Sequence, residues 1–77
     1  MADKNRVLRS METPDGGRCV DIFVRPGGSF GFEEYRREIE DGRGWFPIGF
    51  HAGKRFASEE EAEAKALAAV SWLKDVL

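Results

Sequence analysis

The stretch RCVDIFVR-PGGS-FGFEEYRREIE, residues 18–40, decides the fold because two strand-like runs flank one compact turn. The central sequence Pro-Gly-Gly-Ser, residues 26–29, predicts a turn, since proline presets φ and the two glycines accept positive φ. The runs on either side are rich in Val, Ile, Phe and Tyr, which favour β-strands. This stretch therefore predicts an antiparallel hairpin.

Two similar turns, at residues 14–17 and 41–44, extend the hairpin in both directions. The expected strands are residues 6–12, 18–25, 30–40 and 45–50. A helix follows, with Ser58 as N-cap and Glu61 completing a capping box. From residue 59 to residue 77 it would be roughly 28 Å long. Its apolar face would hold Ala62, Ala66, Ala69, Val70, Leu73, Val76 and Leu77. The sequence predicts one α+β domain, residues 1–77: an antiparallel meander of three to four strands packed on one C-terminal helix.

The two sheet faces follow from the register, provided that each four-residue turn closes its hairpin symmetrically. Met11 then lies opposite Val20, and Val20 lies opposite Tyr35. The face expected to pack on the helix collects Val7, Met11, Val20, Ile22, Val24, Tyr35, Ile39, Phe46, Ile48 and Phe50, with Arg9 and Glu33 flanking Ile22. The other face would carry a row of Leu8, Phe23 and Phe32, with Phe30 and Trp45 on the same side. One helix cannot cover both faces, so this row predicts an exposed apolar patch that binds a partner.

The composition excludes several kinds of site. Cys19 is the only cysteine and His51 the only histidine, so we expect no internal disulfide, no metal centre, no cofactor and no catalytic set. Glu34, Glu38 and Glu40 would alternate outward along one strand, so this acidic run is interpreted as a solvated edge or as cross-strand charge pairing, and not as paired carboxylates for acid–base chemistry. No apolar run resembles a signal peptide or a membrane span of about 20 residues. The lone thiol then favours the cytoplasm.

A nucleic-acid function is the main alternative. The segment from Gly53 through Lys54, Arg55, Phe56 and Ser58 to the helical alanines resembles the last third of the double-stranded-RNA-binding domain. That resemblance implies a three-stranded antiparallel sheet on a C-terminal helix, with basic residues at the helix start gripping phosphates. The candidate contacts are Arg36, Arg37, Arg43, Lys54 and Arg55. The chain departs from the family in having an acidic helix start, residues 59–61, and in lacking the family's first helix.

The overall charge also counts against nucleic acid as the partner, because 12 basic and 14 acidic residues give a net charge of −2. We therefore expect a non-enzymatic binding or accessory module. Its partner would be a second copy of the chain, forming a homodimer, or another protein. A nucleic-acid-binding domain is the alternative, and a small enzyme or ligand-binding protein comes third.

Overall fold

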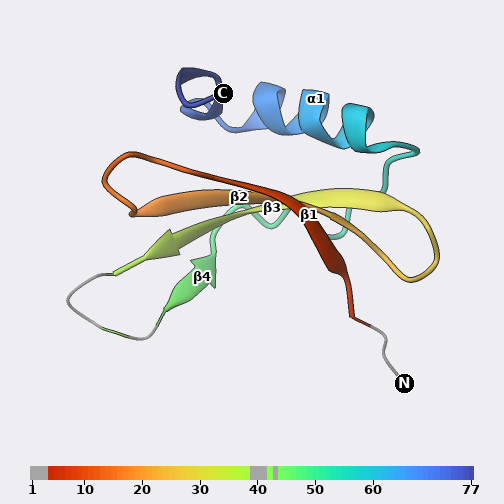
Figure 1. Cartoon of the computed structure of the whole chain (residues 1–77), viewed down its shortest axis with the longest axis horizontal. Helices are drawn as coiled ribbons and strands as arrows, with labels where there is room; N and C mark the ends of the chain where they lie inside the picture. The colour runs from red at the N-terminus through yellow and green to blue at the C-terminus, as the bar shows by residue number, and fades with distance from the viewer. Residues whose placement is uncertain (1–3, 39–41, 43) are drawn as a thin grey trace.

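The computed structural model describes residues 4–38, 42 and 44–77. Within them the chain forms a four-stranded antiparallel sheet in the order β1-β2-β3-β4, covered on one face by a single helix (Figure 1). The elements are β1 (Arg6–Glu12), β2 (Arg18–Val24), β3 (Phe30–Arg37), β4 (Trp45–Pro47), α1 (Glu59–Ala69) and the 3-10 turn η1 (Leu73–Asp75). The predicted α+β meander is confirmed. None of the helices in the described ranges is long and apolar enough to cross a bilayer.

The first hairpin closes as predicted near its turn and departs from the prediction farther away. Met11 lies opposite Val20. Between Val7 and Arg9 the register shifts, so Val7 rather than Leu8 faces Phe23. A bulge of this kind inserts one unpaired residue and bends its strand. Leu8 is that residue, and the expected pairing of Leu8 with Phe23 is wrong.

The second hairpin differs from the prediction by one residue. The Arg25 N–H donates to the Ser29 carbonyl (2.8 Å), and the Gly28 N–H donates to the Arg25 carbonyl (2.9 Å). The loop therefore has three residues, 26–28, and Gly28 has φ 98°. Three-residue hairpin loops commonly use a glycine in this way. Val20 consequently lies opposite Glu34 instead of Tyr35, and a shift of one residue turns every side chain of β3 to the other face.

The core reflects that reversal. Phe32 is 1% exposed and packs between sheet and helix, whereas Tyr35 faces away from the helix. Two other residues expected in the core are exposed: Val7 (51%), beside the bulge, and Phe50 (85%), which has φ 56°. Ile39 lies outside the described residues. The core consists of Met11, Val20, Ile22, Phe32, Ala62, Ala66, Val70 and Leu73, with Phe30, Phe56, Leu67, Trp72 and Val76 partly buried against it.

The helix begins as predicted and ends early. The Ser58 hydroxyl accepts a hydrogen bond from the Glu61 N–H (3.0 Å), and the Glu61 carboxylate accepts one from the Ala57 N–H (2.8 Å). α1 has 11 residues and is about 16 Å long. It ends at Ala69 because the backbone of Val70 is extended (φ −110°, ψ 106°). Beyond it, the Trp72 indole N–H donates to Glu34 on β3 (2.9 Å), while Leu73 is fully buried. The expected continuous helix to residue 77 is wrong.

The segment that joins β4 to α1 is held along the open edge of β3. Phe56 exchanges two backbone hydrogen bonds of 2.9 Å with Phe30. The carboxylate of Glu33, a residue only 3% exposed, accepts hydrogen bonds from the backbone N–H groups of His51 (3.1 Å) and Ala52 (3.2 Å). It also accepts one from the Glu34 N–H (2.8 Å). Glu33 is therefore a buried clamp. It lies opposite Asp21, on the other face of the sheet from Arg9, so its expected place beside Arg9 is wrong.

Candidate interaction surface

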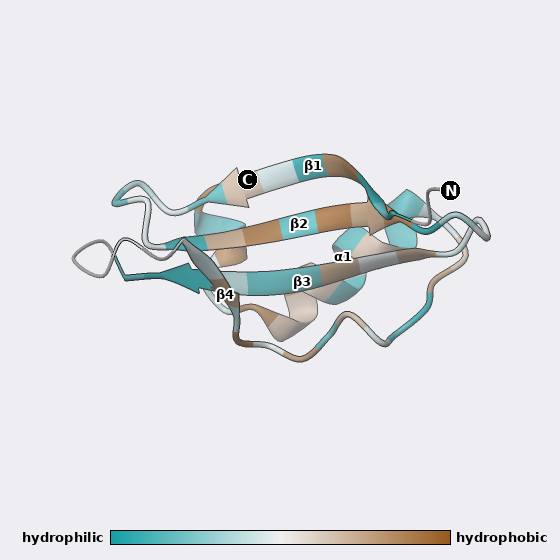
Figure 2. Ribbon diagram, turned by 90° about the horizontal axis from the view of Figure 1, so that it is seen from below, coloured by the Kyte–Doolittle hydropathy of each residue, from teal (hydrophilic) through white to brown (hydrophobic). Residues whose placement is uncertain are grey.

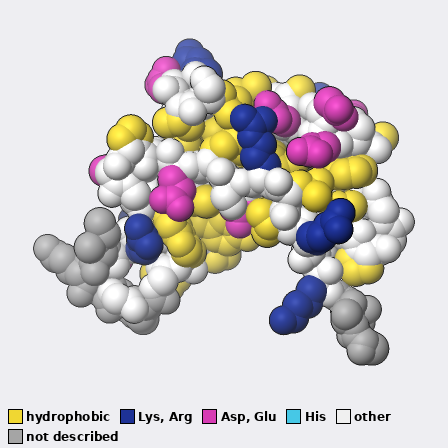
Figure 3. All heavy atoms as spheres, viewed as in Figure 1, with side chains coloured by type: hydrophobic (Ala, Val, Ile, Leu, Met, Phe, Trp, Pro, Cys, Tyr) yellow, Lys and Arg dark blue, Asp and Glu magenta, His cyan; other side chains and the backbone are white. Residues whose placement is uncertain are grey.

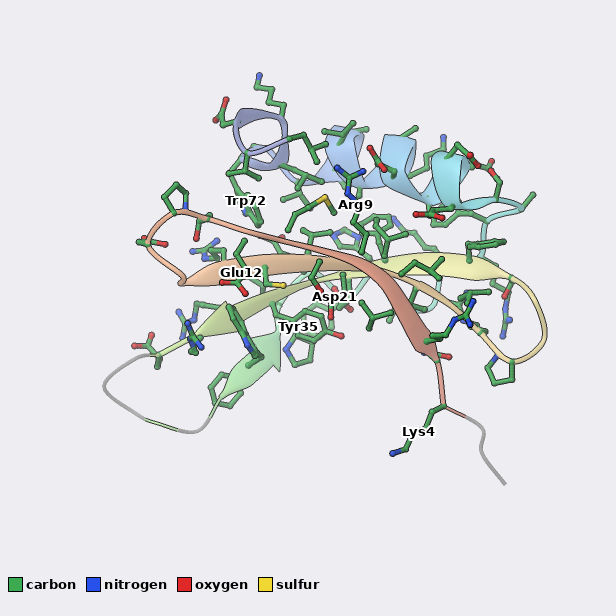
Figure 4. All side chains as sticks on the ribbon, viewed as in Figure 1. Lys4, Arg9, Glu12, Asp21, Tyr35 and Trp72 are labelled. Atoms are coloured by element: carbon green, nitrogen blue, oxygen red, sulfur yellow. The ribbon has the colours of Figure 1, made fainter. Side chains whose placement is uncertain are left out.

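The sheet face turned away from α1 is not covered by any other helix or strand of the described residues. Figure 2 looks onto this face, with β1, β2 and β3 in front of the helix. Figure 4 shows Asp21 and Tyr35 on this side of the sheet, and Arg9 and Trp72 between the sheet and the helical layer. Arg9 there forms an ion pair with Glu63 of α1 (2.7 Å). We call the uncovered side the outer face.

The predicted apolar patch is only partly present on the outer face. Phe23 and Trp45 lie on it, since they pair with Gly31 and Arg37 of β3. Phe30 and Phe32 lie on the helix side, and Leu8 is in the bulge. The expected row of three apolar residues is therefore wrong, and the buried Phe32 has no surface to offer a partner.

Phe23 is also largely covered, for a local reason. A Cβ added at Gly31 would lie 2.9 Å from the Phe23 ring, so the ring lies directly over the glycine. The Arg25 guanidinium stacks on the same ring, 5.0 Å from its centroid. Phe23 is 4% exposed as a result. The aromatic surface left on this face comes from Tyr35 and Trp45, both half-buried.

A shallow hollow of about 180 Å³ lies on the outer face, lined by Ser10, Glu12, Cys19, Asp21, Tyr35 and Trp45. Cross-strand pairing brings these residues together: Ser10 lies opposite Asp21, and Cys19 lies opposite both Glu12 and Tyr35. The Asp21 carboxylate accepts hydrogen bonds from the Ser10 hydroxyl (2.5 Å) and the Cys19 thiol (3.3 Å). Asp21 is thus the polar centre of the hollow.

The charge of the hollow comes from its carboxylates. Burial, followed by the hydrogen bond to Asp21, raises the pKa of the Cys19 thiol to about 12. Burial also raises the pKa of Tyr35, with Asp21 and Glu33 adding to the effect. Both groups are uncharged at neutral pH, and Cys19 is not a thiolate nucleophile. The hollow is therefore acidic, through Glu12 and Asp21, and is suited to binding rather than nucleophilic chemistry.

A cation borders this acidic area. The guanidinium of Arg37 stacks over the Trp45 ring, 4.6 Å from its centroid, and donates to the Gly16 carbonyl (3.0 Å). These contacts hold a positive charge at the β3 and β4 side of the face. Around the hollow, the outer face thus carries negative charge at Glu12 of β1 and Asp21 of β2 and positive charge at Arg37 of β3. Elsewhere on this face lie the buried Glu33 of β3 and Arg25, which stacks on Phe23 just after β2.

The four predicted nucleic-acid contacts that the structure describes do not form one site. Arg36 and Arg37 lie at the end of β3, where Arg36 pairs with Glu38 (3.2 Å). Lys54 and Arg55 lie beside Phe30, at the other end of a strand about 23 Å long. Arg43 lies outside the described residues.

Sequence reasoning missed a basic residue that joins the second group. Arg25 and Arg55 both donate to the Ser29 hydroxyl, each at 3.2 Å. Burial, and then repulsion from Arg55, lowers the pKa of Arg25. Its position just before the turn was the available signal, because a hairpin loop brings its flanking residues together. The helix start remains acidic, with Glu59–Glu61 in the first turn of α1 (Figure 3).

No group of three or more His, Cys, Asp or Glu side chains suited to a metal ion occurs in the part of the chain that the structure describes. His51 stacks on Phe32 with ring centroids 4.7 Å apart, so it is largely a packing residue. Comparisons with models of protein families, with characterised proteins and with solved structures found no match.

Proposed function

We propose that this chain is a non-enzymatic binding module that self-associates through its outer face into a symmetric dimer. The observation that carries the proposal is the charge pattern of that face. Glu12 and Asp21 place negative charge on β1 and β2, and Arg37 places positive charge on β3. A surface with both signs on different strands is complementary to a second copy of itself, which is what a two-fold interface requires.

The strand order explains how the two copies would meet. Adjacent strands lie about 4.8 Å apart, so β1 and β3 are separated by roughly 10 Å. A two-fold axis that lies in the interface, parallel to β2, would place β1 of one protomer over β3 of the other. The carboxylate of Glu12 would then approach the partner's Arg37, twice in each dimer. Charge complementarity of this kind fixes orientation and excludes wrong partners.

The apolar part of the interface would come from Trp45, Tyr35 and the exposed Pro47. Tyr and Trp are enriched among the residues that dominate binding energy. A specific interface buries about 800 Å² on each partner. The described chain has 5041 Å² of accessible surface, so such an interface would cover about a sixth of it. The lone thiol of Cys19 supports a reducing, cytoplasmic setting for this dimer.

A charge-swap experiment tests the proposal by molar mass in solution, measured by light scattering over a range of concentrations. The wild-type chain should dimerise. Glu12→Arg and Arg37→Glu should each give monomers through like-charge repulsion, and the double variant should dimerise again. Lys74→Glu, an equal charge change on η1, should leave the mass unchanged. A wild-type chain that stays monomeric at all concentrations would refute the proposal, as would a double variant that fails to recover while its circular dichroism is native.

Nucleic acid is the second candidate, supported by the cluster of Arg25, Lys54 and Arg55. Arg25 donates to the backbone carbonyls of Ala52 and Lys54 and shares the Ser29 hydroxyl with Arg55, so the three residues are neighbours. No ion pair with a carboxylate is recorded for them in the described part of the chain. Binding to duplex RNA at low salt, lost steeply as salt rises and abolished by Arg55→Glu, would favour this candidate. We expect only weak, non-specific binding at physiological salt.

A further inference from the structure

A groove on the helix side of the sheet is separate from the outer face. It lies between α1 and the segment that pairs with the edge of β3, and its volume is about 420 Å³. Pockets for small molecules typically measure about 300–1,000 Å³. The groove is lined by Phe32, Lys54, Phe56, Lys65, Ala68 and Ala69.

The apolar walls of the groove are fixed by contacts already present. The rings of Phe32 and Phe56 stack with centroids 5.9 Å apart and an interplanar angle of 20°. Phe56 is held by its two backbone hydrogen bonds to Phe30. The Arg25 guanidinium donates to the Lys54 carbonyl (3.0 Å), which fixes the backbone beside the groove. A preformed site of this kind loses little entropy when a ligand binds.

Among the described residues that line the groove, the two charged side chains are both cations. Lys54 comes from the segment along β3 and Lys65 from α1, and no carboxylate is among the described residues that line the groove. Neither ammonium group has an ion pair recorded within the described ranges. Glu61, one helical turn before Lys65, directs its carboxylate to the Ala57 N–H. The two lysines therefore place positive charge around an apolar floor.

We propose that this groove binds a small amphipathic carboxylate, with its apolar body against Phe56, Ala68 and Ala69 and its head group between Lys54 and Lys65. Ligand sites are usually mostly apolar cavities with a few polar groups, which set the orientation and specificity of the ligand. Two ammonium groups select an anion over a neutral or cationic head group. The inference does not depend on dimerisation, since the groove and the outer face lie on opposite sides of the sheet.

The test is titration with decanoate, kept below the concentration at which it forms micelles, and followed by calorimetry and by amide chemical shifts. Decanol and decylamine, which have the same chain with a neutral or a cationic head group, are the matched ligands. Decanoate should bind, with the largest shifts at the amides of residues 54–56 and 65–69. Decanol should bind about tenfold more weakly, and decylamine should not bind.

Variants separate the two parts of the site. Lys54→Glu combined with Lys65→Glu should abolish decanoate binding and allow decylamine to bind, whereas Lys74→Glu should change neither. Ala68→Phe, at an exposed helical position, should fill the groove and block both decanoate and decanol without loss of helix content. Absence of decanoate binding to the wild-type chain would overturn the proposal. Equal binding of decanoate and decanol would overturn it too, because the lysines would then play no part.

Discussion

Replacing Glu33 by alanine should remove a large part of the stability of this domain. The carboxylate is almost completely buried and accepts hydrogen bonds from the backbone N–H groups of Glu34, His51 and Ala52. Hydrogen bonds to a charged group contribute about 1.5–3 kcal/mol each. Because His51 is half-buried and Ala52 exposed, their N–H groups would be partly rehydrated in the variant. We therefore expect a loss of about 3–5 kcal/mol.

That loss is large for a chain of 77 residues, whose expected free energy of unfolding is about 4–12 kcal/mol. Urea unfolding followed by circular dichroism would show this loss of stability as a lower midpoint urea concentration, with an unchanged dependence of the unfolding free energy on urea. Glu33→Gln keeps one acceptor oxygen and the side-chain shape, so it should lose about 1–3 kcal/mol. Glu38→Ala, an exposed carboxylate paired with Arg36, is the control and should change stability by less than about 0.5 kcal/mol.

Hydrogen exchange identifies where the Glu33 effect acts. In the wild-type chain the amides of residues 34, 51 and 52 should exchange slowly, and in Glu33→Ala those of 51 and 52 should exchange fastest, because they lose their acceptor. If Glu33→Ala costs less than about 1 kcal/mol, with protection unchanged at 51 and 52, then Glu33 does not hold this segment and the reasoning is wrong.

Three further predictions concern the cap, the second turn and the thiol. Ser58→Ala should cost about 1 kcal/mol, and the melting temperature should fall by about 4–8 °C, because the Glu61 N–H loses its acceptor. Gly28→Ala should cost about 1–2 kcal/mol through its positive φ alone, since no atom lies within 4 Å of the new Cβ; Gly27→Ala is the control and should be close to neutral. Because folding raises the pKa of Cys19 from 9.0 to about 12, the neutral thiol is favoured in the fold. Stability measured by urea unfolding should therefore fall as pH rises from about 9 towards 12. Cys19→Ala should reduce that slope, and an unchanged slope would exclude Cys19 as its cause.

Local signals in the sequence predicted the elements well. The glycine and proline turns marked all four strands, and Ser58 with Glu61 marked the helix start, because each signal depends on neighbouring residues only. The helix end was not visible in the same way. Apolar residues continue at helical spacing through Val70 and Leu73. What ends α1 is a tertiary arrangement that joins Trp72 to Glu34 and buries Leu73.

Which side chains of β3 lie on each face of the sheet depends on whether the loop before it has three or four residues. A four-residue and a three-residue closure at 26–29 are both compatible with the letters PGGS, and only the observed pairing of Arg25 with Ser29 distinguishes them. The wrong choice exchanged the two faces of β3. The bulge at Leu8 had a similar effect at the far end of β1, where no Gly or Pro marks it. Glu33 was assigned to the wrong face by the same one-residue shift. Its burial was not predictable either, because its partners are backbone groups 18 and 19 residues away.

The observed register also explains why the two proposed sites coexist. It turns Phe32 towards the helix, where it forms part of the groove, and Tyr35 to the outer face, where it lines the acidic hollow. These two residues are three positions apart on β3, an odd spacing that places their side chains on opposite sides of the sheet. The two functions should therefore be separable: Arg37→Glu should abolish dimerisation and leave decanoate binding unchanged, whereas Lys65→Glu should weaken decanoate binding and leave the molar mass unchanged. If either variant changes both properties while the fold stays intact, the sites communicate through β3, and the premise that they are independent is wrong.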